Sequence, residues 1–150
     1  MVGVFLVNMF VIGLAVAIHY ECLHRITRLL PTLNIRHRLR IVLGVFLALT
    51  AHSIEVWVFA IAYYIKHRVD DWGHLQGNFD GSLLDCVYYS FTTYTTLGLG
   101  DIEPHGDLRY LTGLEALTGL VLITWTASFL YLEMTRYLSL IHISEPTRPY

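Results

Sequence analysis

The chain has 150 residues, of which 55 % are hydrophobic and only 15 % charged, and its formal net charge is −2. Soluble domains carry about 25 % charged residues, so this composition, with its positive mean hydropathy, excludes an ordinary soluble protein and indicates a membrane protein. The two cysteines, Cys22 and Cys86, are expected near opposite faces of the bilayer, which excludes a disulfide framework.

The first predicted element is a transmembrane helix within residues 1–20. Its apolar stretch, residues 2–18, is marginal in length, because about 20 residues at a rise of about 1.5 Å cross a hydrocarbon layer of about 30 Å. A signal peptide is the alternative, since Ala15-Val16-Ala17 resembles a cleavage site. The segment lacks a positive n-region, and cleavage would leave an arginine-rich loop to be exported, so a retained helix is favoured.

Residues 21–40 are predicted to form a basic cytoplasmic loop, because such loops are enriched in lysine and arginine. The arginines are Arg25, Arg28, Arg36, Arg38 and Arg40. One interpretation is an interfacial helix broken at Pro31, in which Arg36, Arg38 and Arg40 contact anionic lipid headgroups. The other, which we favour because every inward loop needs such charges, is that they only set the topology. A segment this short beside a membrane is not expected to bind nucleic acid.

The second span, a predicted outer helix over residues 41–65, holds His52 and Glu55 three positions apart on one helical face. Ionisable groups inside a span cost free energy and usually have a partner or a task. We expect these two to pair with each other or with Glu115 of the third span. Two roles stay open: polar contacts between helices, or a site that couples proton concentration to the stability of the loop 95–101.

Residues 83–94 are too short to span the bilayer and are predicted to form a re-entrant pore helix. Ser82 and Asp85 have the spacing of a helix-capping pair. The C-terminal end of this helix carries the negative end of its dipole, which favours a cation beyond it. The residues expected to support the following loop are Tyr89, Thr92 and Thr93 from this helix and Glu115, which should pack near Thr92 or Thr93.

The loop 95–101, with the sequence TTLGLGD, is a predicted ion filter. Gly98 and Gly100 can adopt positive φ without a Cβ clash, so successive carbonyls can face one axis and replace the hydration shell of a cation. The predicted ion-binding carbonyls belong to Thr96, Leu97, Gly98 and Leu99. Thr95, Gly100 and Asp101 are expected to set the geometry and the mouth, and Asp101 could concentrate cations or anchor the loop to the pore helix.

This loop resembles the T-V-G-Y-G-D signature of the potassium-channel superfamily, in the form T-L-G-L-G-D. The extra N-terminal span resembles that of small bacterial ion-channel proteins with a two-helix pore domain. The resemblance implies an all-α membrane fold, a pore domain over residues 41–137, a homotetramer, and potassium ions in the filter with no other cofactor. Leu99 stands where the family usually has an aromatic residue, so a weakly selective monovalent cation channel remains the alternative.

The third span belongs to the predicted inner helix, residues 107–137, which would line the pore below the filter. Gly113 and Gly119 are candidate flex points, the latter in a position resembling the family's hinge glycine. Trp125 or Phe129 could form a hydrophobic constriction that gates by dewetting. Candidate cavity residues are Thr124, Thr126 and Ser128. For each of these residues, ordinary helix packing is the alternative.

The final segment, residues 138–150, is excluded from the fold because its stretch 138–148 is identical to the translation of a common sequencing adapter. The distribution of arginines predicts a multi-pass protein of the cell (inner) membrane, with the N-terminus outside and the C-terminus in the cytoplasm.

The predicted function is a passive cation channel that conducts potassium. A pore subunit of a potassium-uptake transporter is an alternative, although such chains usually carry four pore units and this one carries a single unit. A non-conducting membrane scaffold is the third functional class considered. The sequence shows no nucleophile and no paired catalytic acid, so an enzyme is not expected. The histidines at 19, 24, 37, 67, 74 and 105 show no metal-ligand spacing, and no metal beyond a monovalent cation is predicted.

Overall fold

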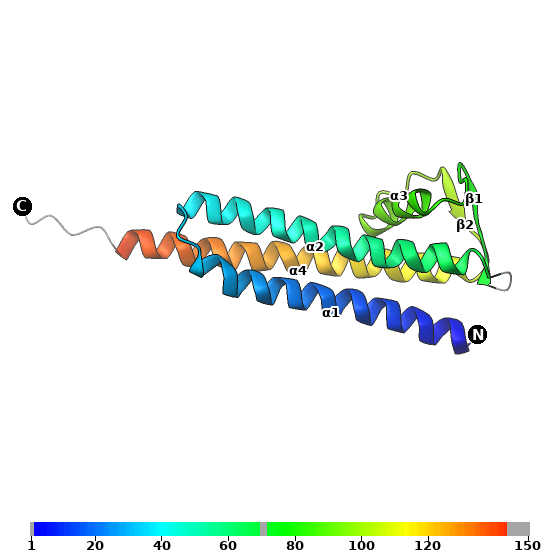
Figure 1. The fold of residues 1–150 in the computed structure, drawn as a ribbon, viewed down its shortest axis with the longest axis horizontal. Coiled ribbons are helices and arrows are strands. Elements are labelled where there is room, and N and C mark those ends of the chain that lie inside the picture. Colours follow the sequence, from blue (N-terminus) through cyan, green and yellow to red (C-terminus); the bar gives the residue numbers. More distant parts are fainter. Residues whose placement is uncertain (1, 70–71, 144–150) are drawn as a thin grey trace, which may run out of the picture.

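A computed structural model describes residues 2–69 and 72–143 of the chain. Three long helices make up most of it, and a short helix with a two-stranded sheet lies at one end (Figure 1). The elements in chain order are α1 (Val2–Thr32), α2 (His37–Lys66), β1 (Leu75–Gly77), α3 (Leu83–Tyr94), β2 (Ile102–Pro104) and α4 (Leu108–Ile143). This is the all-α membrane architecture that the sequence predicts.

The long helices are apolar enough to cross a membrane, over Val2–Thr32, Arg38–Lys66 and Leu108–Thr135. Only 28 % of the most apolar window of each is buried within the chain. Apolar surface of this extent does not persist against water, so it must face lipid or other protein subunits. The three predicted spans are therefore confirmed among the described residues.

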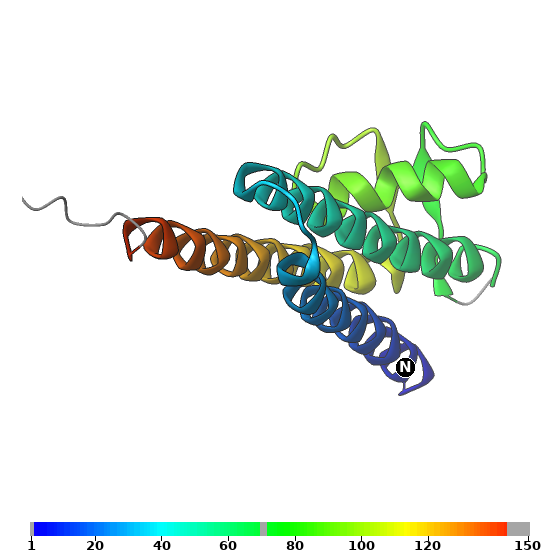
Figure 2. The same ribbon diagram turned by 60° about the vertical axis from the view of Figure 1, so that its left-hand side comes forward.

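The short helix α3 packs against α2 and α4, on the side of the bundle away from α1 (Figure 2). The N-terminus of α1, the C-terminal end of α2 and the β-strands lie at one end of the bundle, and α4 runs to the opposite end (Figure 1). The main core fills the space between these helices, with fully buried Phe59 and Tyr63 from α2 beside Tyr94 and Leu111. Residues far apart in the sequence thus surround the C-terminal end of α3.

Helix α1 differs from its prediction, because it continues through most of the segment expected to be a basic loop and ends at Thr32. Glu21 accepts a hydrogen bond from Arg25 one turn later at 2.7 Å, a pairing that supports a helix. Pro31 lies in the last turn and does not break the helix in two. The non-helical connection to α2 is correspondingly short, and Arg40 donates a hydrogen bond to the carbonyl of Leu33 across it at 2.6 Å.

Apolar packing explains why this helical extension forms. Leu23, Ile26 and Leu30 are buried and recur at helical spacing. Against them pack Leu43, Leu47 and Phe129 from α2 and α4. An apolar stripe of this kind stabilises a helix through tertiary contacts. The charged residues of this segment concealed the stripe in the sequence. Helix α4 runs into the adapter-like segment 138–150 as far as Ile143. Residues 144–150 lie outside the described residues, and the origin of this segment stays a prediction.

The strands β1 and β2 were not predicted, and they join the two ends of the segment that contains α3 and the loop after it. They pair antiparallel, with Leu75 opposite Pro104 and Gly77 opposite Ile102. The backbone N–H of Leu75 also donates to Nδ1 of His67 at 3.1 Å, and burial lowers the pKa of this histidine below its ordinary value. The strands therefore fix the C-terminal end of the loop to the end of α2.

The start of α3 is capped as its sequence predicts. The hydroxyl oxygen of Ser82 accepts a hydrogen bond from the backbone N–H of Asp85 at 3.1 Å. The backbone N–H of Ser82 in turn donates to Asp80 at 2.7 Å, and hydrogen bonds from Ser82 hold the pKa of the Asp80 carboxyl below its ordinary value.

Replacing Ser82 by alanine is expected to lower the stability of the protein by about 0.5–2 kcal/mol, because it removes the side-chain acceptor of this cap. The measurement is the apparent unfolding temperature of the purified variant in detergent. Ser53→Ala is the matched control, since the Ser53 hydroxyl donates only to the carbonyl of Leu49 within its own helix in the hydrogen bonds found. Equal unfolding temperatures for the two variants would contradict the capping role.

Candidate functional site

The sign of φ alternates along the loop after α3. Thr96, Gly98 and Gly100 have φ of +59°, +52° and +78°, and no other non-glycine residue among those described has positive φ. Alternation of left- and right-handed residues turns successive peptide groups to the same side of the chain. This is the geometry expected for a row of carbonyls that faces one axis.

Thr96 has the most unusual backbone conformation in this loop. A β-branched residue with positive φ is a genuine conformational outlier, and strain of this kind clusters at functional sites. Two backbone hydrogen bonds to α3 hold the region in place: Thr96 N–H donates to Thr93 O at 2.9 Å, and Gly98 N–H donates to Thr92 O at 3.0 Å. Thr92 and Thr93, predicted as supports, therefore act through their carbonyl oxygens.

The C-terminal end of the loop is anchored twice. The Tyr88 hydroxyl donates to a carboxylate oxygen of Asp101 at 2.9 Å, and this hydrogen bond raises the pKa of Tyr88 above its ordinary value. The backbone carbonyl of Asp101 accepts from Asn78 N–H at 2.8 Å. At Gly77, where φ is +110°, a Cβ would lie 2.2 Å from that carbonyl oxygen, so only glycine permits this approach. Asp101 thus makes the expected kind of bond to the pore helix.

Two leucine side chains of the loop are largely exposed. Leu97 is 64 % exposed and Leu99 is 58 % exposed. A cavity of about 380 Å³ lies beside the loop, lined by Tyr89, Leu99 and Thr112 among others. Tyr89, a predicted support, is buried and shares a hydrogen bond of 2.9 Å with Thr112 of α4. The loop is therefore braced on one side by α3 and α4 and exposed on the other.

Glu115 is fully buried where α2, α3 and α4 meet. Its carboxylate accepts a hydrogen bond from the Tyr63 hydroxyl at 2.6 Å and another from the Ser90 hydroxyl. The Ser90 oxygen also lies 2.9 Å from the carbonyl of Val56. The sequence placed Glu115 near Thr92 or Thr93, whereas its contact with α3 is at Ser90, about one helical turn earlier. Tyr63 and Ser90 were not predicted, because ordinary tyrosines and serines give no sequence signal of such a role.

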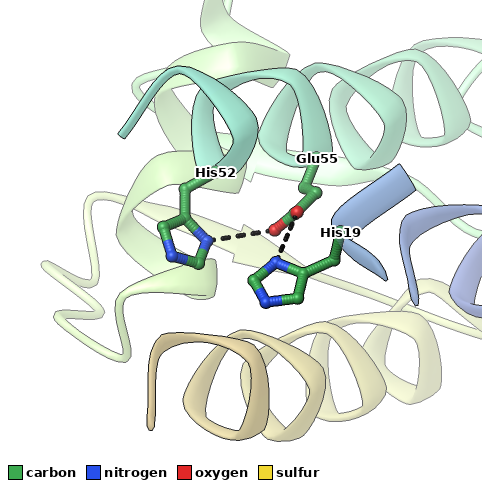
Figure 3. A group of neighbouring side chains, drawn as sticks. All are labelled: His19, His52 and Glu55. Carbon is green, nitrogen blue, oxygen red and sulfur yellow. Dashed lines mark hydrogen bonds and ion pairs between the residues drawn. The ribbon is translucent and has the colours of Figure 1, made fainter. Parts of the chain in front are cut away.

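A second polar cluster joins α1 to α2, with the side chains of His19, His52 and Glu55 turned toward one another (Figure 3). His52 Nδ1 lies 3.1 Å from one carboxylate oxygen of Glu55, and His19 Nδ1 lies 2.9 Å from the other. The Tyr94 hydroxyl at the end of α3 donates to Glu55 as well. His52 and Glu55 are thus brought together as expected, while the hydrogen bonds of Glu115 run to other residues.

His19 is the residue of this cluster that the sequence did not indicate. It lies on a different helix from His52 and Glu55, so no spacing along the chain connects it to them. The available signal was a histidine at the end of an apolar span, where an ionisable side chain usually has a partner. A search for metal-ligand spacing within one segment cannot detect such a site.

Gly119 packs directly against the end of α3. A Cβ at this position would lie 2.1 Å from the carbonyl oxygen of Tyr94, whereas a Cβ at Gly113 would meet no atom within 4 Å. Helix α4 runs without interruption past both. The structure therefore gives Gly119 a role in close packing, in addition to any flexing.

The two residues proposed for a constriction both contact α1, although Trp125 remains 41 % exposed. Phe129 packs against the apolar stripe of α1, and the ring of Trp125 lies 5.2 Å from that of His19. Thr126 is buried, with its hydroxyl 3.0 Å from His52 Nε2, whereas Thr124 and Ser128 are exposed on the opposite face. Phe129 is partly buried in this packing between α1, α2 and α4, and a constriction at Trp125 or Phe129 stays a prediction.

A comparison with protein-family models matches residues 41–136 to the ion-channel family. The match begins within α2, includes α3 and the loop after it, and ends within α4. Searches of the curated proteins and of the solved structures found no match.

Proposed function

The chain belongs to the ion-channel family, a family of transport proteins and not of enzymes, and from this premise we propose that it conducts potassium passively through the loop 95–101. The carbonyl oxygens of Thr96, Leu97, Gly98 and Leu99 bind the cation in place of water. The protein is a multi-pass membrane protein. We further propose that it resides in the cell membrane with its N-terminus outside.

The observation that carries this proposal is the alternation of positive φ at positions 96, 98 and 100. An extended strand would point successive carbonyls to opposite sides, and a helix would use them in its own hydrogen bonds. The loop is neither a strand nor a helix. Its alternating φ leaves a row of carbonyls on one side of the chain, and among the described residues these carbonyls are not used in helix or strand hydrogen bonds. Carbonyl oxygens arranged in rings can replace the hydration shell of a cation as it passes.

Two further features support a cation at this position. Helix α3 ends at Tyr94, so the negative end of its dipole is directed toward the base of the loop. One copy provides carbonyls on a single side only, and the exposed Leu97 and Leu99 leave apolar surface uncovered. We therefore propose a homotetramer, in which four loops surround one axis and neighbouring subunits cover these side chains.

The arginines and the arrangement of the helices support the proposed orientation. Arg36 and Arg38 are exposed at the turn between α1 and α2, at the opposite end of the bundle from the strands (Figure 1). Basic residues favour the cytoplasmic side, which puts the mouth of the loop outside. Anionic lipid headgroups are proposed partners for Arg36 and Arg38, and for Arg40 beside them.

The test is ion flux into liposomes that contain the purified protein, with potassium, sodium and caesium compared at equal concentration. The proposal expects potassium flux well above that of protein-free liposomes and above that of sodium. Equal potassium and sodium flux would favour the weakly selective channel that Leu99 leaves open. No cation flux from a folded tetramer would contradict the proposal.

Tyr88→Phe is expected to reduce the ratio of potassium to sodium flux by about 2- to 10-fold. The substitution removes the hydrogen bond that anchors Asp101 to α3, and a bond worth about 0.5–1.5 kcal/mol corresponds to this range. Tyr110→Phe is the matched control, because Tyr110 is an exposed tyrosine at the start of α4. An unchanged flux ratio in Tyr88→Phe would show that the anchor does not set selectivity.

A further inference from the structure

Three side chains with metal-binding atoms meet in the interior of the chain, outside the loop that carries the proposed function. They are His19 from α1 and His52 and Glu55 from α2 (Figure 3). One ligand atom of each lies within 4.8 Å of the ligand atoms of the other two. His19 and Glu55 have no exposed side-chain surface, and the side chain of His52 is 15 % exposed.

The distances between these atoms are close to those of a coordination sphere. His19 Nδ1 and His52 Nδ1 lie 2.9 Å and 3.1 Å from the two carboxylate oxygens of Glu55. Ligand atoms about 2.0–2.2 Å from a tetrahedral ion are about 3.4 Å apart. Small side-chain movements would therefore place an ion between the three groups without a change in the backbone.

The donor set selects the class of metal. Two imidazole nitrogens and one carboxylate are ligands of zinc(II) and similar transition-metal ions, whereas calcium and magnesium prefer oxygen ligands only. Three protein ligands leave a fourth position in a tetrahedral site. The Tyr94 hydroxyl bonds to Glu55 and lies 3.0 Å from His52 Nδ1, so it adjoins that fourth position.

The surroundings offer each histidine a hydrogen-bond partner on the nitrogen that a metal would leave free. Nε2 of His52 lies 3.0 Å from the Thr126 hydroxyl, and Nε2 of His19 lies 3.4 Å from the same oxygen. Without an ion, Nδ1 of each histidine can donate its proton to Glu55. An ion bound between the three groups displaces these protons, and each imidazole can then keep a proton on Nε2 that is donated to Thr126. Outer hydrogen bonds of this kind orient ligand imidazoles in metal sites.

The cluster can also be reached. A cavity of about 410 Å³ is lined by His52, Tyr94 and Thr126, and it extends to Thr95 at the base of the loop. An entry path is one of the requirements for a metal site, and this cavity provides it on the side of His52.

We propose that His19, His52 and Glu55 form a binding site for one zinc(II)-class cation per chain, which joins α1 to α2 beside the end of α3. The site is distinct from the potassium-binding carbonyls and does not depend on conduction. An occupied site holds the first helix, which lies outside the region matched to the ion-channel family, against the pore domain. Through Glu55 it also acts on Tyr94, the residue directly before the filter loop.

The test is metal binding by the full chain, stripped with a chelator and titrated with zinc chloride in detergent. The expected result is one bound zinc per chain, and a cobalt-substituted sample with the visible absorption of a tetrahedral site. His19→Gln is expected to weaken zinc binding by at least about 10- to 100-fold, the loss that removal of an outer-shell partner alone produces. His24→Gln, on the same helix and stacked on Tyr20, is the matched control and should bind zinc as the parent does.

Two further variants test whether zinc binds at His19 and not elsewhere in the chain. The rings of His74 and His105 stack at 5.1 Å next to the ends of the strands, so all titrations use a His105→Gln background that excludes zinc binding by this pair. His19→Cys replaces the imidazole with a thiolate, and it should retain cobalt and add a thiolate-to-cobalt charge-transfer band. Absence of zinc binding in the parent, tight binding by folded His19→Gln, or a cobalt spectrum unchanged by His19→Cys would overturn the proposal.

Discussion

Gly98→Ala is expected to reduce potassium flux by more than about 100-fold. Gly98 has φ of +52°, and a Cβ there would meet no atom within 4 Å, so the effect comes from backbone conformation and not from a clash. An L-residue in this region costs about 1–2 kcal/mol, and four copies in a tetramer together cost about 4–8 kcal/mol. A change of about 5.5 kcal/mol is enough to invert a two-state equilibrium from 99:1 to 1:99.

The control for this variant is D-alanine at the same position, introduced by chemical ligation. D-alanine carries the same methyl group but favours positive φ, so flux should recover. Gly13→Ala, at a glycine of α1 whose Cβ would also meet nothing within 4 Å, should leave flux unchanged. If L-alanine at position 98 conducts like the parent, the left-handed conformation of this residue is not needed and the proposed loop geometry is wrong.

Gly119→Ala is expected to lower both stability and flux, because its methyl group would lie 2.1 Å from the Tyr94 carbonyl oxygen. Backbone atoms of two packed helices cannot move apart as a flexible side chain can, and overpacking of this kind costs about 1–3 kcal/mol or more. Displacement of Tyr94 also shifts Thr95 and the loop after it. The measurements are the apparent unfolding temperature and potassium flux in liposomes.

Gly113→Ala tests whether the effect of Gly119→Ala comes from overpacking or from reduced bending of α4. A Cβ at Gly113 meets no atom within 4 Å, and alanine is about 1 kcal/mol more favourable than glycine inside a helix. This variant should therefore be at least as stable as the parent. A loss of flux in Gly113→Ala without a loss of stability would identify a hinge there. Equal stability of Gly119→Ala and Gly113→Ala would contradict the close packing at Gly119.

The parts of the structure that the sequence predicted are those with local signals. The helix α3 covers the predicted residues because Ser82 marks its start and the loop of alternating glycines follows its end. The three spans are long apolar runs, which length alone reveals. The positive φ of Gly98 and Gly100 follows from the absence of a side chain, whereas the positive φ of Thr96 has no local cause and depends on the bonds to α3.

The parts that the sequence did not predict depend on contacts between distant segments. The two strands are too short to show an alternating pattern, and α3 and the loop separate them. The extension of α1 depends on apolar residues of α2 and α4. His19 approaches Glu55 only because α1 crosses α2 at that level. In each case the determining interaction joins residues that no window along the chain contains together.

The claim on which the account depends is that main-chain oxygens of residues 96–99 bind the permeant cation. The direct measurement is a crystal structure of the assembled protein in thallium(I), which substitutes for potassium and scatters anomalously. The account predicts anomalous peaks on the fourfold axis, each surrounded by carbonyl oxygens of Thr96, Leu97, Gly98 and Leu99 from four chains. Peaks found only at side chains such as Asp101, or an assembly that does not bring the four loops together, would contradict it.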